Sequence, residues 1–162
     1  MITLGQKVIF LDIDGVLNSN DWYVRTRGKN KKDEGDIDPQ AVSYPNEIIK
    51  NTSAKIVMSS SWRTDFENSC NLLYEKGLIS NSIIGKTPSF VYQCQDDDIR
   101  ESLCRGNEIK YYIDKNNVTK YVILDDDRDM LFCQKDNFIP IDFMYGLTKQ
   151  HVEVATYILN KK

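Results

Sequence analysis

The stretch KVIFLDIDG, residues 7–15, decides the fold of this chain. Its first five residues form an apolar run without polar alternation, which is typical of a strand buried on both faces of a sheet. The run stops abruptly at Asp12, Asp14 and Gly15. Two later runs have the same form: residues 55–58 (KIVM) lead into Ser59, Ser60 and Ser61, and residues 121–124 (YVIL) lead into Asp125, Asp126 and Asp127.

Helical patterns separate these strands, and the alternation predicts an α/β fold. We expect weaker strands at 82–84 and 138–139, and helices from Thr64 to Gly77, over 108–115 and over 149–160. Thr64 and Glu67 have the spacing of a capping box. Asp38 and Pro39 open a short helix, which Pro45 should interrupt. The sequence therefore predicts a Rossmann-like, doubly wound, mostly parallel sheet in a single domain spanning residues 1–162.

The composition is that of an ordinary soluble domain, and it narrows the classes of function. With 162 residues, 41% hydrophobic and 28% charged, the chain can bury a core. A formal net charge of −3 argues against binding that rests mainly on nucleic-acid backbone contacts. No apolar run reaches membrane length, and the first one is too short for a signal peptide. The four cysteines contain no C-x-x-C pair and there is one histidine, so we expect free thiols, no zinc site and a cytoplasmic location. We also expect a monomer.

The polar clusters at the strand ends predict a metal site. Ligands in an open parallel sheet bind beyond the carboxyl ends of the strands. If the three strong strands are neighbours, one crevice receives Asp12, Asp14, Ser60, Asp125 and Asp126. So many carboxylates raise one another's pKa unless a cation neutralises them. Mg²⁺ prefers such oxygen ligands and leaves room for phosphate and water.

Four segments together resemble the motifs of haloacid dehalogenase (HAD) phosphatases, in the order of that family. They are residues 10–18 (FLDIDGVLN), 56–63 (IVMSSSWR), 105–109 (RGNEI) and 122–129 (VILDDDRD). The sequence SSSWR, together with Gly146, Leu147 and Thr148 before the last helix, further resembles a HAD subgroup associated with RNA repair. Taken alone, an Asp-x-Asp-Gly segment is also compatible with a plain turn.

The resemblance implies roles for the matching residues. Asp12 is the expected nucleophile, forming an aspartyl-phosphate, and Asp14 the expected general acid and base. Ser60 is expected to bind the phosphoryl group, with Ser59 as the alternative, and Arg105 to neutralise it. The serines also suit a helix cap.

The resemblance also implies the Mg²⁺ ligands. They are Asp12, the backbone carbonyl of Asp14, and Asp126 with Asp125 beside it, while Asp129 supports the site. Three consecutive acids leave the register open among Asp125, Asp126 and Asp127.

Little chain remains for the cap domain that encloses small substrates in many HAD enzymes, so the crevice should be open. The basic residues Arg25, Arg27, Lys29, Lys31 and Lys32 form either a flap beside it, within residues 19–35, or a solvated loop. Trp62 and Arg63 are further candidates for substrate contact, although Trp62 also suits packing.

These observations predict a Mg²⁺-dependent phosphohydrolase that acts on phosphorylated nucleotide or polynucleotide ends. One alternative is a phosphatase of small nucleotides or sugar phosphates. Another is a non-catalytic, Mg²⁺-binding phosphoacceptor module similar to a response-regulator receiver, although a receiver lacks the D-x-D-G pattern. The sequence does not distinguish a 3′ from a 5′ end.

Overall fold

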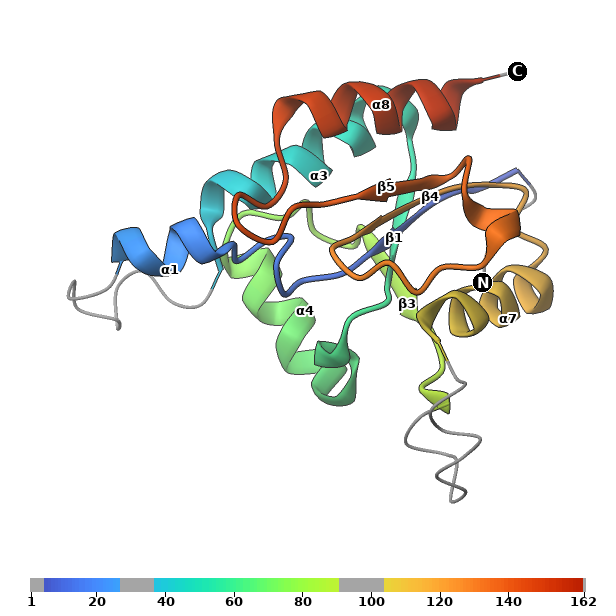
Figure 1. Ribbon diagram of the computed structural model, residues 1–162, viewed down its shortest axis with the longest axis horizontal. Helices are drawn as coiled ribbons and strands as arrows, with labels where there is room; N and C mark the ends of the chain where they lie inside the picture. Colours follow the sequence, from blue (N-terminus) through green and yellow to red (C-terminus); the bar gives the residue numbers. More distant parts are fainter. Residues whose placement is uncertain (1–4, 27–36, 91–103, 162) are drawn as a thin grey trace.

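The computed structural model describes residues 5–26, 37–90 and 104–161, and its centre is a five-stranded sheet (Figure 1). All neighbouring strands are parallel, in the order β3-β2-β1-β4-β5. The strands are β1 (Lys7–Leu11), β2 (Lys55–Met58), β3 (Ile83–Lys86), β4 (Lys120–Asp125) and β5 (Phe138–Pro140). The predicted α/β class and parallel sheet are confirmed.

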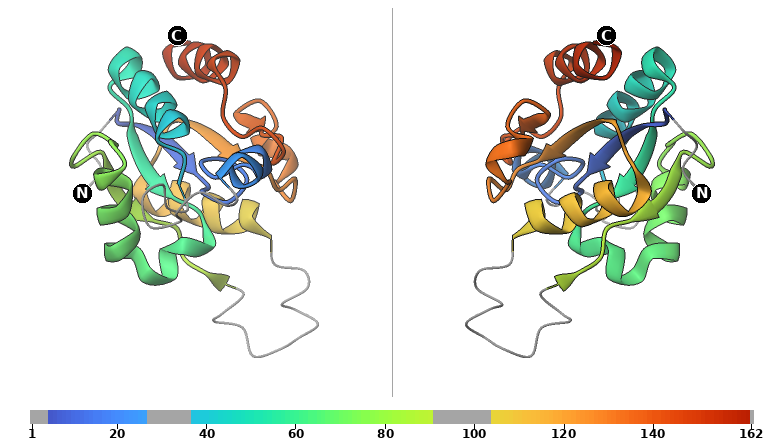
Figure 2. Two further views of the ribbon diagram at one scale, coloured as in Figure 1. Left: turned by 90° about the vertical axis from the view of Figure 1, so that its left-hand side faces the viewer. Right: turned by 90° about the vertical axis from the view of Figure 1, so that its right-hand side faces the viewer.

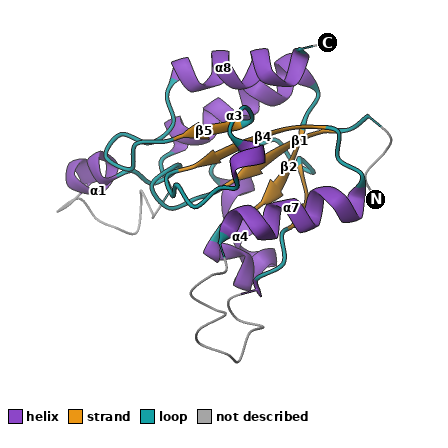
Figure 3. Ribbon diagram, turned by 45° about the vertical axis from the view of Figure 1, so that its right-hand side comes forward, coloured by secondary structure: helices purple, strands orange, loops and turns teal. Residues whose placement is uncertain are grey.

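Helices cover both faces of the sheet, as a doubly wound fold requires (Figures 2 and 3). One hydrophobic cluster joins Ile9, Ile56 and Val122 of the strands to α3 and α8, and α4 adds Cys70 and Leu73 to it. On the opposite face, Phe10, Val57 and Ile123 pack against Ile109 of α7. The helices are α1 (Asn20–Thr26), α3 (Pro39–Thr52), α4 (Phe66–Glu75), α7 (Arg105–Asn116) and α8 (Lys149–Asn160), with 3₁₀ helices η1 (Ser61–Asp65) and η2 (Phe132–Gln134).

Three local predictions were wrong. α3 does not stop at Pro45 but continues to Thr52, because Pro45 is buried against the core and this packing offsets the lost backbone hydrogen bond. The Thr64 capping box does not form: η1 precedes α4, and Thr64 Oγ1 donates to the carbonyl of Ser61 instead. α7 begins at Arg105 rather than at Glu108.

The register of the central strands brings the polar clusters together. Leu11 lies beside Met58 on one side and Leu124 on the other. Backbone bonds continue one residue further, since Asp12 N donates to Leu124 O and Ser59 N donates to Leu11 O, both at 3.0 Å. The three strands therefore end level, and the residues that follow them share one edge of the sheet. Among the described residues, no helix is both long and apolar enough to cross a membrane.

Candidate active site

A cluster of three carboxylates lies at this edge. Oxygen atoms of Asp12, Asp125 and Asp126 all fall within 4.8 Å of one another. Asp12 and Asp125 are buried, and Asp126 is half-buried. Arg105 reaches in from α7, with Nη1 at 2.9 Å from Asp12 Oδ1 and 3.3 Å from Asp125 Oδ2. Asp127, by contrast, has a side chain that is 68% exposed and lies 3.8 Å from Arg105 Nη2. The third acid of the run thus points away from the cluster.

Burial and mutual repulsion disfavour the ionised form of these acids. Burial raises the pKa of Asp12, against the lowering effect of Arg105. Burial and the charge of Asp12 raise the pKa of Asp125 to about 8 and that of Asp126 to about 6. One guanidinium therefore does not neutralise the cluster.

The arrangement fits a divalent cation. When all three acids are ionised, three negative charges face the single positive charge of Arg105, which leaves two uncompensated. Apart from its ion pair with Arg105, the buried Asp125 Oδ2 has no hydrogen-bond partner among the described residues. An oxygen-rich site of this charge is what Mg²⁺ prefers. Asp12, Asp125 and Asp126 are the side chains that would hold it.

Gly15 makes room for Asp126. Its φ of +69° is in the left-handed region, and a Cβ at this position would lie 2.4 Å from Asp126 Oδ2. A larger residue would therefore both strain the turn after Asp14 and displace a carboxylate of the cluster.

Contacts of the backbone at Arg105 and Gly106 fix the position of Arg105. Asp129 Oδ2 accepts a hydrogen bond from Arg105 N at 2.8 Å, consistent with the supporting position expected for Asp129. The next residue, Gly106, packs so closely that a Cβ there would lie 2.6 Å from Leu131 N. Buried Gln134 donates to Gly106 O and accepts from Leu131 N. The first turn of α7 is thus fixed against the loop that follows the acids.

Ser60 lies closer to the chemistry than Ser59. The Ser60 hydroxyl hydrogen-bonds Asp12 and lowers the pKa of that carboxyl, and it also caps η1 by accepting from Trp62 N at 3.3 Å. The two roles expected for Ser60, helix capping and phosphate binding, are therefore compatible. Ser59 Oγ is buried and has no hydrogen-bond partner in the part of the chain that the structure describes, while the Ser59 carbonyl accepts from Arg105 Nη1. This geometry favours Ser60 as the phosphate ligand.

The structure argues against the substrate contact expected for Arg63. This side chain is buried, and Nη1 donates to the carbonyls of Ser59 and Ser60 at 2.9 Å each. Nη2 pairs with buried Glu108 Oε2 at 2.7 Å. Glu108 Oε1 in turn accepts from Phe90 N at 2.8 Å. Arg63 is committed to holding the serine loop against α7.

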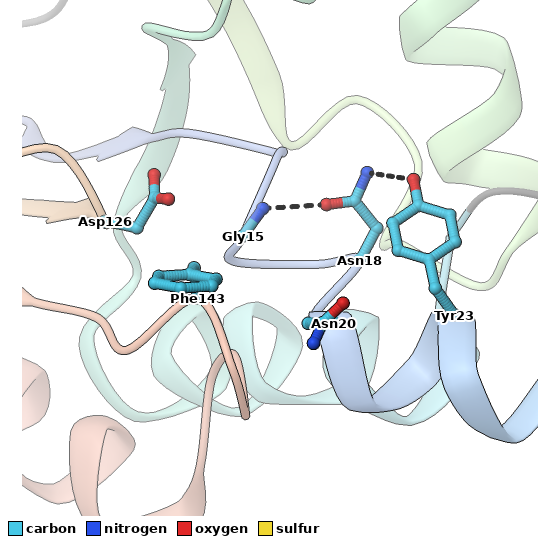
Figure 4. Close-up of a pocket in the computed structure, with 6 residues that line it drawn as sticks. All are labelled: Gly15, Asn18, Asn20, Tyr23, Asp126 and Phe143. Carbon is cyan, nitrogen blue, oxygen red and sulfur yellow. Dashed lines mark hydrogen bonds between the residues drawn. The ribbon is translucent and has the colours of Figure 1, made fainter.

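Asp14 stands at the exposed rim of the crevice. Trp62 Nε1 lies 3.0 Å from each of its carboxylate oxygens, and Asn18 Nδ2 donates to Oδ1 at 2.8 Å. Asn18 also accepts from Gly15 N and approaches the Tyr23 hydroxyl at 3.2 Å (Figure 4). Trp62, expected at the substrate, is therefore engaged with the predicted acid and base.

Only one end of the basic segment lies within the described residues. Arg25 pairs with Asp21 at 2.7 Å, approaches Asp38 at 3.9 Å, and lies over the Trp22 ring. Arg27, Lys29, Lys31 and Lys32 lie outside the described residues.

Sequence reasoning missed several supporting residues, including Glu108, Gln134 and Asn18. Glu108 and Arg63 are 45 positions apart, and no local pattern joins them. Asn18 was inside a quoted motif, and its place four residues after Asp14 was an available signal.

Residues 8–152 match the family described as the HAD domain in Swiss Army Knife RNA repair proteins. Searches of curated proteins and of solved structures gave no significant match.

Proposed function

Because this chain belongs to the family of HAD domains in Swiss Army Knife RNA repair proteins, and HAD domains are phosphohydrolases in general, we propose that it is a Mg²⁺-dependent phosphatase of phosphorylated polynucleotide ends. The observation that supports the chemistry best is the convergence of Asp12, Asp125, Asp126 and Arg105 at the carboxyl edge of the sheet.

The residues suit a two-step displacement at phosphorus. Asp12 attacks the phosphorus atom, the bond to the leaving oxygen breaks, and Asp14 gives its proton to that oxygen. Water then attacks the aspartyl-phosphate, Asp14 takes a proton from it, and inorganic phosphate leaves. Arg105 and the Ser60 hydroxyl bind phosphoryl oxygens, where negative charge develops. When bound, Mg²⁺ supplies the positive charge that lets phosphate approach three carboxylates.

Removal of the nucleophile tests the chemistry. We expect Asp12→Asn to reduce hydrolysis of an aryl phosphate by about 10³-fold or more, because an amide is a poor nucleophile. Chelation of divalent ions should have the same effect, reversed by added Mg²⁺. Asp114→Asn is a matched control, since Asp114 is an exposed acid on α7. Wild-type rates in Asp12→Asn would disprove the mechanism.

The polynucleotide substrate rests on the RNA repair family and on an open crevice, to which the described residues contribute no cap. A basic segment beside the crevice would contact phosphates other than the one removed. For single strands the log–log salt slope is about −0.7 per phosphate contacted. We therefore expect kcat/KM for a phosphorylated oligonucleotide to fall steeply with salt, and kcat/KM for a sugar phosphate to fall little.

The same salt series distinguishes the alternatives. Changing Arg25, Arg27, Lys29, Lys31 and Lys32 to Gln should flatten the oligonucleotide slope and leave the sugar-phosphate rate unchanged. Equal slopes for both substrates in the wild-type protein would favour a small-molecule phosphatase. The absence of turnover on every phosphate would favour the phosphoacceptor module.

A further inference from the structure

A shallow pocket of about 250 Å³ adjoins the acidic cluster and has no part in the chemistry at phosphorus. It shares Asp126 with the cluster, and Gly15, next to Asp14, forms part of its wall. In Figure 4, Phe143 and Tyr23 lie on either side of the two asparagines. Pockets that enclose drug-sized ligands occupy roughly 300–1,000 Å³. This one suits a single flat group attached to the reacting phosphate. Its lining is Gly15, Asn18, Asn20, Tyr23, Asp126 and Phe143.

Two aromatic rings of this pocket are exposed. Phe143 is 56% exposed and Tyr23 is 43% exposed. Rings this exposed do not owe their position to burial in the core. Exposed aromatic rings beside a phosphate-binding crevice are typical of sites where unpaired bases stack.

The backbone holds Phe143 in position before any ligand binds. Its carbonyl accepts from Asn20 N at 2.9 Å, and the carbonyl of Met144 accepts from Asp21 N at 3.0 Å. Within the loop, Tyr145 N donates to Asp142 O at 3.0 Å. The loop after β5 is therefore tied to the start of α1, and binding does not have to order it.

The charge of the lining selects against a second phosphate. Of the described residues that line the pocket, Asp126 alone is charged, and none is a lysine or an arginine. The amide of Asn18 is buried and already bonded to Gly15, Asp14 and Tyr23. The exposed amide of Asn20 gives one hydrogen bond to Met144 Sδ and still presents a donor and an acceptor to the pocket. A neutral, flat group with polar edges fits these surroundings, and a nucleobase is such a group.

We propose that the pocket between Tyr23 and Phe143 is a subsite for the terminal nucleobase of the substrate, the base of the nucleotide whose phosphate is removed. This inference rests on the proposed function and adds a recognition element to it. The aromatic rings stack on the base, and the shared Asp126 wall places its phosphate at the acidic cluster.

The test uses oligonucleotides with a 5′- or a 3′-terminal phosphate, each with either a normal or an abasic terminal nucleotide. Stacking of one base on an aromatic side chain contributes about ten-fold or more. We expect wild-type kcat/KM to be about ten-fold higher with the base than without it, at the preferred end.

Phe143→Ala should bring this ratio close to one, mainly through KM. Tyr157→Ala removes another exposed aromatic, on α8 and outside the pocket, and should keep the wild-type ratio. Equal wild-type kcat/KM for normal and abasic ends would overturn the subsite.

A binding measurement separates this inference from the proposed function. Asp12→Asn protein with Mg²⁺ is titrated with an oligonucleotide that carries terminal 2-aminopurine, whose fluorescence falls on stacking. We expect quenching, and about ten-fold weaker binding when Phe143→Ala is added. Quenching without turnover by the wild-type protein would contradict the phosphatase alone. No quenching, or quenching that Phe143→Ala leaves unchanged, would overturn the subsite even if other phosphates are hydrolysed.

Discussion

The floor and the rim of the crevice differ in how their charged groups are held. The floor consists of Asp12, Asp125, Arg105, Arg63 and Glu108, which are buried or nearly so and paired with one another. The rim consists of Asp14, Trp62, Tyr23 and Phe143, which all reach solvent. Trp62 is hydrogen-bonded to Asp14, and the Tyr23 hydroxyl is hydrogen-bonded to Asn18.

This difference indicates a division of tasks. A buried charge that loses its partner is costly, so each floor residue depends on the others. Exposed groups tolerate change, because water replaces a lost partner. We therefore expect floor substitutions to reduce both stability and activity, and rim substitutions to reduce activity or selectivity alone.

The largest stability effect should come from the ion pair between Arg63 and Glu108. Glu108→Ala leaves a buried guanidinium without its partner, which typically costs about 3–5 kcal/mol. Denaturant unfolding measures this loss. The same helix offers a matched control, because Asp114 forms an exposed pair with Lys110, with side chains 62% and 51% exposed. Asp114→Ala should leave the free energy of unfolding close to that of the wild-type protein.

The double variant Arg63→Met with Glu108→Leu sharpens the comparison. Apolar replacement of a whole buried pair is often tolerated. It should therefore recover much of the stability that Glu108→Ala loses. If Glu108→Ala and Asp114→Ala are equally stable, the floor is no more interdependent than the surface.

A smaller effect should appear as a pH dependence of thermal unfolding. Burial raises the pKa of Asp125 to about 8 and that of Asp126 to about 6, from the 3.8 of an aspartate in water. At pH values between the unfolded and the folded pKa of each acid, the folded chain binds more protons than the unfolded chain. The free energy of unfolding therefore falls as pH rises through this range. Without divalent ions, the unfolding midpoint should fall by a few degrees between pH 5 and pH 8.

Bound Mg²⁺ competes with those protons, so saturating Mg²⁺ should remove most of the decline. Asp125→Asn should flatten the metal-free profile, because the group with the highest pKa no longer ionises. A metal-free midpoint that rises over this range would contradict the assignment of these acids to a repulsive floor.

The sequence predicted the parts of the floor that follow strands. Buried parallel strands are continuous apolar runs, and their ends are marked by the first polar residue, which identified Asp12 and Asp125 of the floor and Ser59 beside them. The parallel register then brings these positions to one edge. The sequence left open which acids of the run 125–127 belong to the cluster. The structure excludes Asp127, whose side chain is directed to solvent.

The supports of the floor were beyond sequence reasoning. Glu108 reads as an ordinary acid in the first turn of a helix, where it is expected to face water. Its burial depends on where α7 packs relative to the serine loop, which is a tertiary property. Pro45 shows the same limit, since local propensity predicted a helix end that core packing overrides.

The smallest effect should come from Trp62 on the rim. Trp62→Phe keeps a ring but removes the Nε1 donor that lies 3.0 Å from both oxygens of Asp14. A hydrogen bond to a charged group contributes about 1.5–3 kcal/mol, and about 1.4 kcal/mol corresponds to ten-fold in rate. Because Asn18 still holds Asp14, we expect the lower end, about a ten-fold fall in kcat on an aryl phosphate with unfolding unchanged. Trp22→Phe is the matched control: among the described residues its buried Nε1 has no hydrogen-bond partner, so no bond to a catalytic group is lost and kcat should stay near wild type. Equal falls in kcat for both variants would show that ring packing, rather than the hydrogen bond to Asp14, is what the rim requires.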